Sequence, residues 1–257
     1  MFSIETDGPV ARITLANPKR RNALGLQLMQ KLTEALGELG PRTDIGVIVV
    51  AAEGPAFSAG HDLSEMVDRD PEFYDGLFAA CTHLMDAIRE VPQPVIAEVA
   101  GVATAAGCQL VAACDLAVAS TEATFATPGV RIGLFCSTPM VPISRAVGRK
   151  RAMEMLLTGE PIDADTAAQW GLVNRVVPPD RLREATDELA ARITRFSDHT
   201  IAIGKQAFYR QLDCGEPQAY DLTRQVMAAN AATDDAQEGI DAFLAKRPPS
   251  WSGRQGR

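Results

Sequence analysis

Long apolar runs and positive charge are what the sequence most clearly lacks. No apolar run reaches the ~18 residues of a membrane-spanning helix, so we expect no membrane span. The net charge of −8 argues against a nucleic-acid partner, because nucleic-acid binders carry a basic surface that meets the phosphates. The N-terminus, MFSIETDGPV, has neither the basic region nor the apolar region of a secretory signal. With 46% hydrophobic and 23% charged residues, the composition is typical of a soluble globular protein.

Disulfide and metal-binding patterns are missing as well. The five cysteines are odd in number and none forms a C-x-x-C pair, which indicates reduced thiols in a cytosol-like compartment. We therefore expect a cytoplasmic location. The three histidines, at positions 61, 83 and 199, are scattered without the spacing of zinc ligands. No metal site is expected.

The most informative stretch of the chain is Pro55–Met66, PAFSAGHDLSEM. It follows an apolar run over 45–52 that favours a buried parallel strand. The small residues just before His61 allow a ligand or another chain segment to approach closely. Asp62, with Glu65 three residues later, is typical of a helix start with a capping box. This order predicts that the backbone N–H of His61 lies near an opening and beside a helix N-terminus, where it can stabilise negative charge.

A second stretch repeats the arrangement. Residues 94–100 are expected to form a buried strand, and the small residues Ala105–Cys108 to open an apolar helix. Two strand-to-helix turns with tiny side chains can aim two backbone N–H groups at one point. Two such donors on one carbonyl oxygen form an oxyanion hole, in which a single donor is worth roughly 10²–10³ in rate. Taken alone, each stretch is better interpreted as an ordinary tight turn.

Together the two stretches resemble the enoyl-CoA hydratase/isomerase (crotonase) superfamily. The resemblance is carried by AFSAGHDLSEM, PVIAEVAGVATAAGCQLVAACDLAVAS and ATFATPGVRIGL, and it continues in order to QEGIDAFLAKRPP, so it covers nearly the whole chain. It implies an α/β fold, a crotonase-like superhelix of ββα repeats with an all-helical C-terminal subdomain. It also implies an acyl-CoA thioester as the ligand, with coenzyme A as part of the substrate and no separate cofactor.

The resemblance assigns the catalytic positions. The oxyanion donors are the backbone N–H groups of His61 and Ala106, which hold the thioester carbonyl and favour its enolate-like state. The two glutamates that serve hydratases as acid and base correspond here to Gln109 and Gly129. An amide accepts no proton at neutral pH, and glycine has no side chain. General acid–base catalysis contributes roughly 10²–10⁴ in rate. We therefore expect the usual hydration to be strongly slowed and the oxyanion hole to be retained.

Four other side chains are candidates for the missing chemistry. His61 titrates near neutrality when unperturbed, and a histidine that merely lines the pocket is an equal alternative. For Glu98 and Asp115, near the second turn, a structural role is favoured. Cys136 is interpreted as a small packing residue rather than a nucleophile, because no basic neighbour in the sequence lowers its pKa.

Alternatives to hydration stay open. The segment SAGHDL also resembles methylmalonyl-CoA decarboxylase of the same superfamily, whose reaction needs an oxyanion hole and little acid–base machinery. Cys136 stands where that enzyme has a tyrosine, which weighs against this alternative. Hydrolysis, isomerisation or another lyase reaction would use the same hole, and a non-catalytic acyl-CoA binder is the remaining possibility.

The resemblance also implies the residues that bind the acyl-CoA. Lysine suits a phosphate as a point charge, and an adenine can stack on an aromatic ring or a cation. The nucleotide end is assigned to Lys19, Arg20 and Arg21, the pantetheine path and adenine pocket to Ala23, Ala59, His61, Asp62 and Leu63, the acyl pocket to Leu134, Phe135 and Cys136, and a neighbouring subunit's contribution to Phe243 and Lys246.

The pattern of elements predicts two domains. Strands and helices alternate up to residue 197, and only helices are expected after it. We therefore expect a ββα core over 1–197 and a helical subdomain over 198–257. By resemblance the helical part serves oligomerisation and covers the acyl-CoA pocket, which implies a homotrimer or a hexamer.

Overall fold

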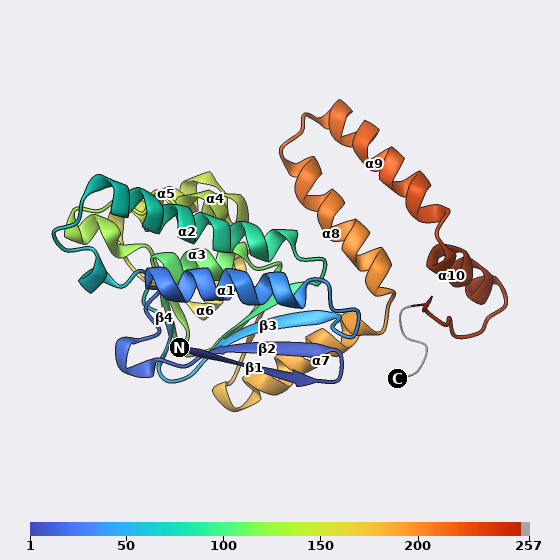
Figure 1. The fold of residues 1–257 in the computed structure, drawn as a ribbon, viewed down its shortest axis with the longest axis horizontal. Helices are drawn as coiled ribbons and strands as arrows, with labels where there is room; N and C mark the ends of the chain where they lie inside the picture. Colours follow the sequence, from blue (N-terminus) through green and yellow to red (C-terminus); the bar gives the residue numbers. More distant parts are fainter. Residues whose placement is uncertain (253–257) are drawn as a thin grey trace.

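Two sheets form the centre of the computed structural model, which describes residues 1–252 (Figure 1). The larger sheet has the order β1-β2-β3-β5-β7-β10 and is parallel except for the β1–β2 hairpin. Its strands are β1 (Phe2–Asp7), β2 (Val10–Leu15), β3 (Val47–Ala52), β5 (Val95–Val99), β7 (Leu116–Ser120) and β10 (Arg175–Val177). The smaller sheet, in the order β4-β6-β8-β9, comprises β4 (Ala56–Ser58), β6 (Val102–Thr104), β8 (Thr124–Ala126) and β9 (Ile162–Asp163).

From β3 to β8, successive strands go alternately to the larger and the smaller sheet, and this alternation makes the ββα repeat. The pair β3 and β4 precedes α2 (Pro71–Glu90), β5 and β6 precede α3 (Ala106–Ala113), and β7 and β8 precede the turn η3 (Pro128–Ile132) and α4 (Met140–Val147). The expected α/β superhelix of ββα repeats is confirmed. Its consequence is that the short strands β4 and β6 lie side by side, so that the segments following them meet.

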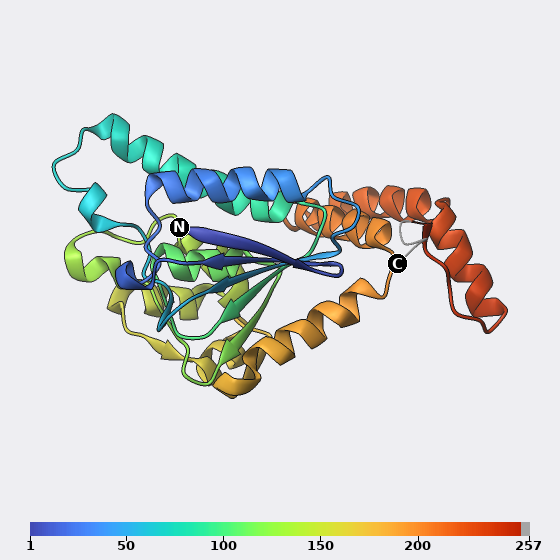
Figure 2. The ribbon, with the colours of Figure 1, turned by 60° about the horizontal axis from the view of Figure 1, so that its bottom comes forward.

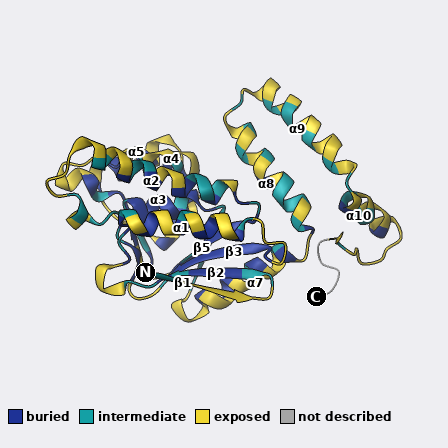
Figure 3. Ribbon diagram, viewed as in Figure 1, coloured by how far each residue is buried: buried dark blue, intermediate teal, exposed yellow. Residues whose placement is uncertain are grey.

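Helices cover the larger sheet on both faces (Figure 2). On one face, α1 (Leu26–Leu39) and α2 pack against residues such as Ile13 and Ile48; on the other, α7 (Leu182–Thr194) packs against Val47, Val49 and Ile96. Side chains on both faces of β3 are therefore buried, as is typical of a parallel strand between two helical layers. The central strands appear dark blue in Figure 3 for this reason.

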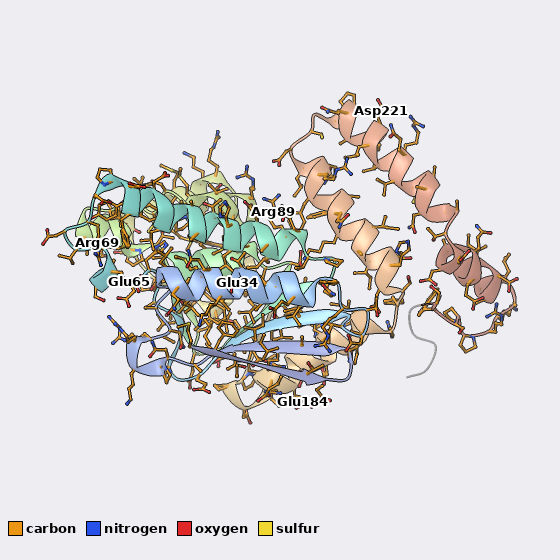
Figure 4. All side chains as sticks on the ribbon, viewed as in Figure 1. Glu34, Glu65, Arg69, Arg89, Glu184 and Asp221 are labelled. Carbon is orange, nitrogen blue, oxygen red and sulfur yellow. The ribbon has the colours of Figure 1, made fainter. Side chains whose placement is uncertain are left out.

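The C-terminal helices form an arm that leaves the body (Figures 1 and 2). After α5 (Arg149–Thr158), α6 (Ala164–Trp170) and α7, the arm consists of α8 (Asp198–Leu212), α9 (Glu216–Ala231) and α10 (Asp234–Leu244). No residue of α9 is buried (Figure 3). Arg89, at the end of α2 that faces α8, lies 4.8 Å from the ring centroid of Tyr209 (Figure 4). The division of the chain into 1–197 and 198–257 stays a prediction, and its last five residues lie outside the described part.

Two acidic residues that were candidates for catalysis have structural partners. Glu98 lies 2.6 Å from the buried guanidinium of Arg12, on the α7 side of the sheet. Asp115 holds α8 against the body, because its carboxylate lies 2.7 Å from Lys205 Nζ and accepts a hydrogen bond from the Tyr209 hydroxyl at 2.7 Å. Burial lowers the pKa of Lys205, while Asp115 raises it. The structural role favoured for both carboxylates is confirmed.

The helix start expected at Asp62 is present, but only as a short 3-10 helix, and the expected capping box is wrong. The chain makes only the short turn η2 (Leu63–Glu65), and the next α-helix begins at Pro71. The Asp62 side chain caps this turn by accepting from the backbone N–H of Ser64 at 3.1 Å. Glu65 does not close a capping box. Its carboxylate accepts a hydrogen bond from the backbone N–H of Leu26 at 2.9 Å and so caps α1 (Glu65 is labelled in Figure 4). The three-residue turn η2 therefore supplies no α-helix N-terminus beside His61.

Candidate functional site

The two strand-to-helix turns border one cavity of about 730 Å³. Its walls come from the turn η1 (Pro18–Arg20), the segment around η2, the first residues of α3, η3 and the segment that leads into α4. Most of the residues assigned from the sequence meet here. They are Lys19, Arg20, Ala23, Ala59, His61, Asp62, Leu63, Ala106, Gly129, Leu134, Phe135 and Cys136.

Four assigned residues lie elsewhere. Arg21 is exposed in the turn after η1 and does not line the cavity. Gln109 is 3% exposed and borders a second cavity of about 450 Å³, where its side-chain oxygen lies 3.6 Å from the thiol of Cys81. Phe243 and Lys246 belong to the end of the arm, far from the cavity within this chain (Figure 1). Their role at the site stays a prediction that requires a second copy of the chain.

Glycine at two positions lets the turns touch. A Cβ on Gly107 would lie 2.2 Å from the carbonyl oxygen of Ser58, which is too close for any side chain. A Cβ on Gly60 would lie 3.1 Å from the backbone nitrogen of Ala106, and Gly60 also has a φ of +88°. The chain around residue 60 therefore packs directly on the start of α3. This contact brings the backbones of residues 61 and 106 to the same wall.

The backbone N–H groups of His61 and Ala106 have no acceptor among the described residues. Residues 24 and 61 form a short parallel bridge. In it the Leu24 N–H donates to the Gly60 carbonyl at 2.8 Å, and the Leu24 carbonyl accepts from the Asp62 N–H at 3.3 Å. The amide of His61 therefore points to the opposite side of this strand pair from Leu24. Ala106 is the first residue of α3, where an N–H has no partner within the helix. Both residues line the cavity.

Ala105 turns the chain sharply into α3. Its φ of 49° and ψ of −120° are rare for a residue with a side chain, and such conformations cost roughly 1–3 kcal/mol. The strained residue is fixed by its backbone N–H, which donates to the carbonyl of Ala126 on β8 at 2.9 Å. This conformation sets the orientation of the peptide that carries the Ala106 N–H.

Gly129 has no room for a side chain. A Cβ there would lie 2.0 Å from the carbonyl oxygen of Leu134 and 2.8 Å from Cys136 Sγ. A glutamate at this position would require the backbone to move. Burial also raises the pKa of the Cys136 thiol, which disfavours the thiolate and agrees with the interpretation of Cys136 as a packing residue.

The imidazole of His61 lies half-buried in the cavity wall. Burial lowers its pKa from about 6.5 to about 4, so the ring is neutral at physiological pH. The ring of Phe78 meets it edge-on, with 5.3 Å between the ring centroids. Nε2 is buried and has no hydrogen-bond partner.

Charged side chains gather at the mouth of the cavity. Arg20 lies 3.0 Å from the Asp62 carboxylate and donates to the Ser64 hydroxyl at 2.7 Å. Lys19 and Arg131 are exposed beside them. Sequence reasoning missed Arg131 and Phe78, because they enter the wall through tertiary packing and no local pattern marks them. Within residues 1–252, no group of three or more His, Cys, Asp or Glu side chains is arranged to hold a metal ion.

Known proteins share this architecture and sequence. The chain matches the family described as enoyl-CoA hydratase/isomerase over residues 5–254. It belongs to the enoyl-CoA hydratase/isomerase family. A crystal structure of an enoyl-CoA hydratase from Mycobacterium smegmatis is 47% identical, with a TM-score of 0.95 over 97% of this chain and 98% of the other. By family, the chain is therefore an acyl-CoA enzyme of the hydratase/isomerase type.

The segments SAGHDL and GLFCSTP indicate a likeness to one group within the family, enoyl-CoA hydratase domain-containing protein 3, and this likeness is confirmed. The mouse protein of that name is 48% identical over 249 residues, which are 96% of this chain and 83% of that protein. The crystal structure of the human protein is 48% identical, with a TM-score of 0.95 over 97% of this chain and 99% of the other.

The cytoplasmic location expected from the sequence is overturned. Five relatives of this group, from mouse, rat, human, Xenopus laevis and zebrafish, are named as mitochondrial proteins. The expectation failed because reduced cysteines exclude only an oxidising compartment and do not choose between reducing ones. Separately, none of the helices in the described residues is both long and apolar enough to cross a membrane.

Proposed function

We propose that this enzyme binds an acyl-CoA thioester in the 730 Å³ cavity and polarises its carbonyl with the backbone N–H groups of His61 and Ala106. Hydrogen bonds to the carbonyl oxygen stabilise the negative charge that develops there as the thioester becomes enolate-like. Backbone donors need no particular side chain at either position. The observation that supports the proposal is that these two amides lack a protein acceptor and border one cavity.

The family's usual hydration is the first candidate reaction. The residues at the two positions that correspond to the family's glutamates favour a second candidate reaction. At one position Gln109 borders the other cavity, and at the other Gly129 excludes any side chain. Nothing at these positions activates water or protonates the α-carbon. A lyase reaction in which the acyl group itself supplies the electron pair, such as decarboxylation, fits the retained oxyanion hole better than hydration. An isomerase or hydrolase reaction would use the same hole but would need a proton-transfer group from outside these two positions.

Contacts to the rest of the acyl-CoA follow from the cavity's two ends. Lys19 and Arg20 at the mouth suit the phosphates, and Leu134 and Phe135 offer apolar surface to the acyl chain. Coenzyme A thus enters as part of the substrate. We propose no further cofactor.

The proposal includes a trimer or hexamer in which α10 of one subunit reaches the cavity of another. Phe243 is 82% exposed and Leu244 74% exposed on this chain, although both are large and apolar. An arm with such side chains is suited to burial against a second copy. Analytical ultracentrifugation would test this, and a monomer at micromolar concentration would contradict it.

A panel of acyl-CoA thioesters tests the proposed function. Saturated, 2-enoyl, 3-hydroxyacyl and malonyl-type thioesters of several lengths are incubated with the enzyme and analysed by mass spectrometry, and binding is measured by calorimetry. Conversion of a panel member supports an enzyme and identifies its reaction. Binding without conversion indicates the non-catalytic binder. Failure to bind any thioester contradicts the proposal.

A further inference from the structure

The side chain of His61 has a hydrogen-bonding atom that the proposed oxyanion hole does not use. Of the two ring nitrogens, Nε2 is buried without a partner. No hydrogen bond involves Nδ1 within the described residues, and Nδ1 is not among the buried atoms that lack a partner. Nδ1 is therefore the nitrogen open to the cavity that this residue lines.

The surroundings select one tautomer of the ring. An N–H that is buried without an acceptor costs more than a buried lone pair. The proton of the neutral imidazole therefore belongs on Nδ1, where a ligand can accept it, and the bare lone pair on Nε2. The ring of Phe78 packs edge-on against the imidazole and restricts the plane of the ring. Burial supports the neutral form, since it lowers the pKa of His61 to about 4.

Other polar side chains of the cavity are less suited to meet the acyl group. Asp62 is engaged by Arg20 and by the Ser64 hydroxyl, and Lys19 and Arg131 are exposed at the mouth. Cys136 is a weak donor, and its burial raises the pKa of the thiol. His61 also carries one of the two proposed backbone donors, so its imidazole is attached next to the thioester oxygen.

We propose that His61 donates a hydrogen bond through Nδ1–H to an oxygen of the bound acyl-CoA next to the thioester, as a third donor beside the two backbone amides. The acceptor is a neutral oxygen, either a substituent on C3 of the acyl group or an amide carbonyl of the pantetheine. This inference rests on the proposed function. It makes His61 a specificity-determining residue whose neutral ring neither takes up nor releases a proton.

Two substitutions separate the ring nitrogens. An asparagine amide places an N–H group close to the position of Nδ1, whereas the longer glutamine amide reaches toward Nε2. We therefore compare H61N with H61Q, and use H83N on the exposed face of α2 as the control. Dissociation constants are measured for butanoyl-CoA, 3-hydroxybutanoyl-CoA and free CoA, with mass spectrometry confirming that each ligand stays intact during the titration.

The expected result is that H61Q weakens binding roughly 5- to 20-fold, the effect of losing a hydrogen bond of this kind, that H61N weakens it clearly less than H61Q, and that H83N binds like the wild type. A loss confined to 3-hydroxybutanoyl-CoA identifies the C3 oxygen as acceptor, and an equal loss for both thioesters identifies the pantetheine. Wild-type affinity in H61Q would overturn the inference but leave the backbone oxyanion hole standing. Failure of the wild type to bind either thioester would overturn both.

Nitrogen NMR of ¹⁵N-histidine-labelled wild-type enzyme measures the tautomer of His61 directly. The chain has three histidines, and the signal lost in H61N belongs to His61. We expect the neutral Nδ1–H tautomer at pH 7 and a shift of the Nδ1 signal when butanoyl-CoA or 3-hydroxybutanoyl-CoA is added. An Nε2–H tautomer or an imidazolium ion would contradict the inference.

Discussion

The backbone donors of this site and its acid–base side chains compare differently with the family's pattern. At the turns around residues 61 and 106, glycines at 60 and 107 and the strained Ala105 keep two amides free beside one cavity. At the two positions of the family's glutamates, one side chain borders another cavity and the other is absent. A backbone donor survives any substitution that keeps the chain's path, whereas a carboxylate is lost in one substitution. On the proposed function, the chain therefore retains the charge-stabilising half of the family's chemistry.

The sharpest way to break this comparison is to remove one backbone donor. Ala106 is the first residue of α3, a position where proline is tolerated. Ala106→Pro should lower kcat/KM for the acyl-CoA identified by the panel by roughly 10²–10³, since it deletes one oxyanion donor. Ala106→Gly keeps the N–H and should stay near wild-type activity. Equal activity of the two variants, at equal melting temperatures, would show that this amide does not act on the thioester.

The buried His61 ring predicts a dependence of stability on pH. The pKa of His61 is lowered to about 4 in the folded chain, so the unfolded chain binds the proton first as the pH falls below about 6.5. Stability should therefore decrease from pH 6.5 to pH 4, by at most about 3 kcal/mol at 1.4 kcal/mol per pKa unit. Urea unfolding of wild type and His61→Asn across this range measures it. Parallel curves for the two proteins would contradict the lowered pKa.

Restoring a side chain at residue 129 should damage the fold rather than restore hydration. A Cβ there meets the Leu134 carbonyl at 2.0 Å, so Gly129→Ala should lower the free energy of unfolding by roughly 1–3 kcal/mol. Gly37, on α1, has no atom within 4 Å of such a Cβ, and Gly37→Ala should raise it by up to about 1 kcal/mol. Denaturant titrations compare them. A stable Gly129→Glu with new hydratase activity would refute the steric argument.

The smallest expected effect concerns Ala105. Glycine adopts a positive φ without strain, so Ala105→Gly should raise the free energy of unfolding by about 1 kcal/mol and leave the turn in place through its bond to Ala126. The same substitution at Ala103, a buried residue of β6, should destabilise the protein. Thermal unfolding distinguishes the two variants. A loss of stability in both would mean that Ala105 is not strained.

Local sequence signals predicted the regular elements well. The Asp7-Gly8 turn marks the β1–β2 hairpin, and Gly8 has the positive φ that this turn needs. The apolar run before residue 52 is β3, buried on both faces. The three-residue strand β4 has no clear signal in the sequence, because so short a strand shows no periodicity and forms through pairing with β6.

The direction of site residues was harder to predict. Nearly every residue of α3 is buried, including Gln109, so the helix has no polar face from which to tell which cavity Gln109 borders. The crowding at Gly129 arises from Leu134 and Cys136, which are local in sequence but face it only because η3 folds back. Phe243 and Lys246 were assigned by resemblance alone, and the path of the arm carries them away from this chain's own cavity.

The central claim is that two main-chain amides polarise one thioester carbonyl, and isotope-edited infrared spectroscopy measures that polarisation without requiring turnover. Butanoyl-CoA labelled with ¹³C at the thioester carbonyl is bound to wild type, Ala106→Gly and Ala106→Pro. We predict that the carbonyl band moves to lower wavenumber on binding to the first two proteins and largely returns toward its solution position in the third. An unshifted band in the bound wild-type complex would contradict the account.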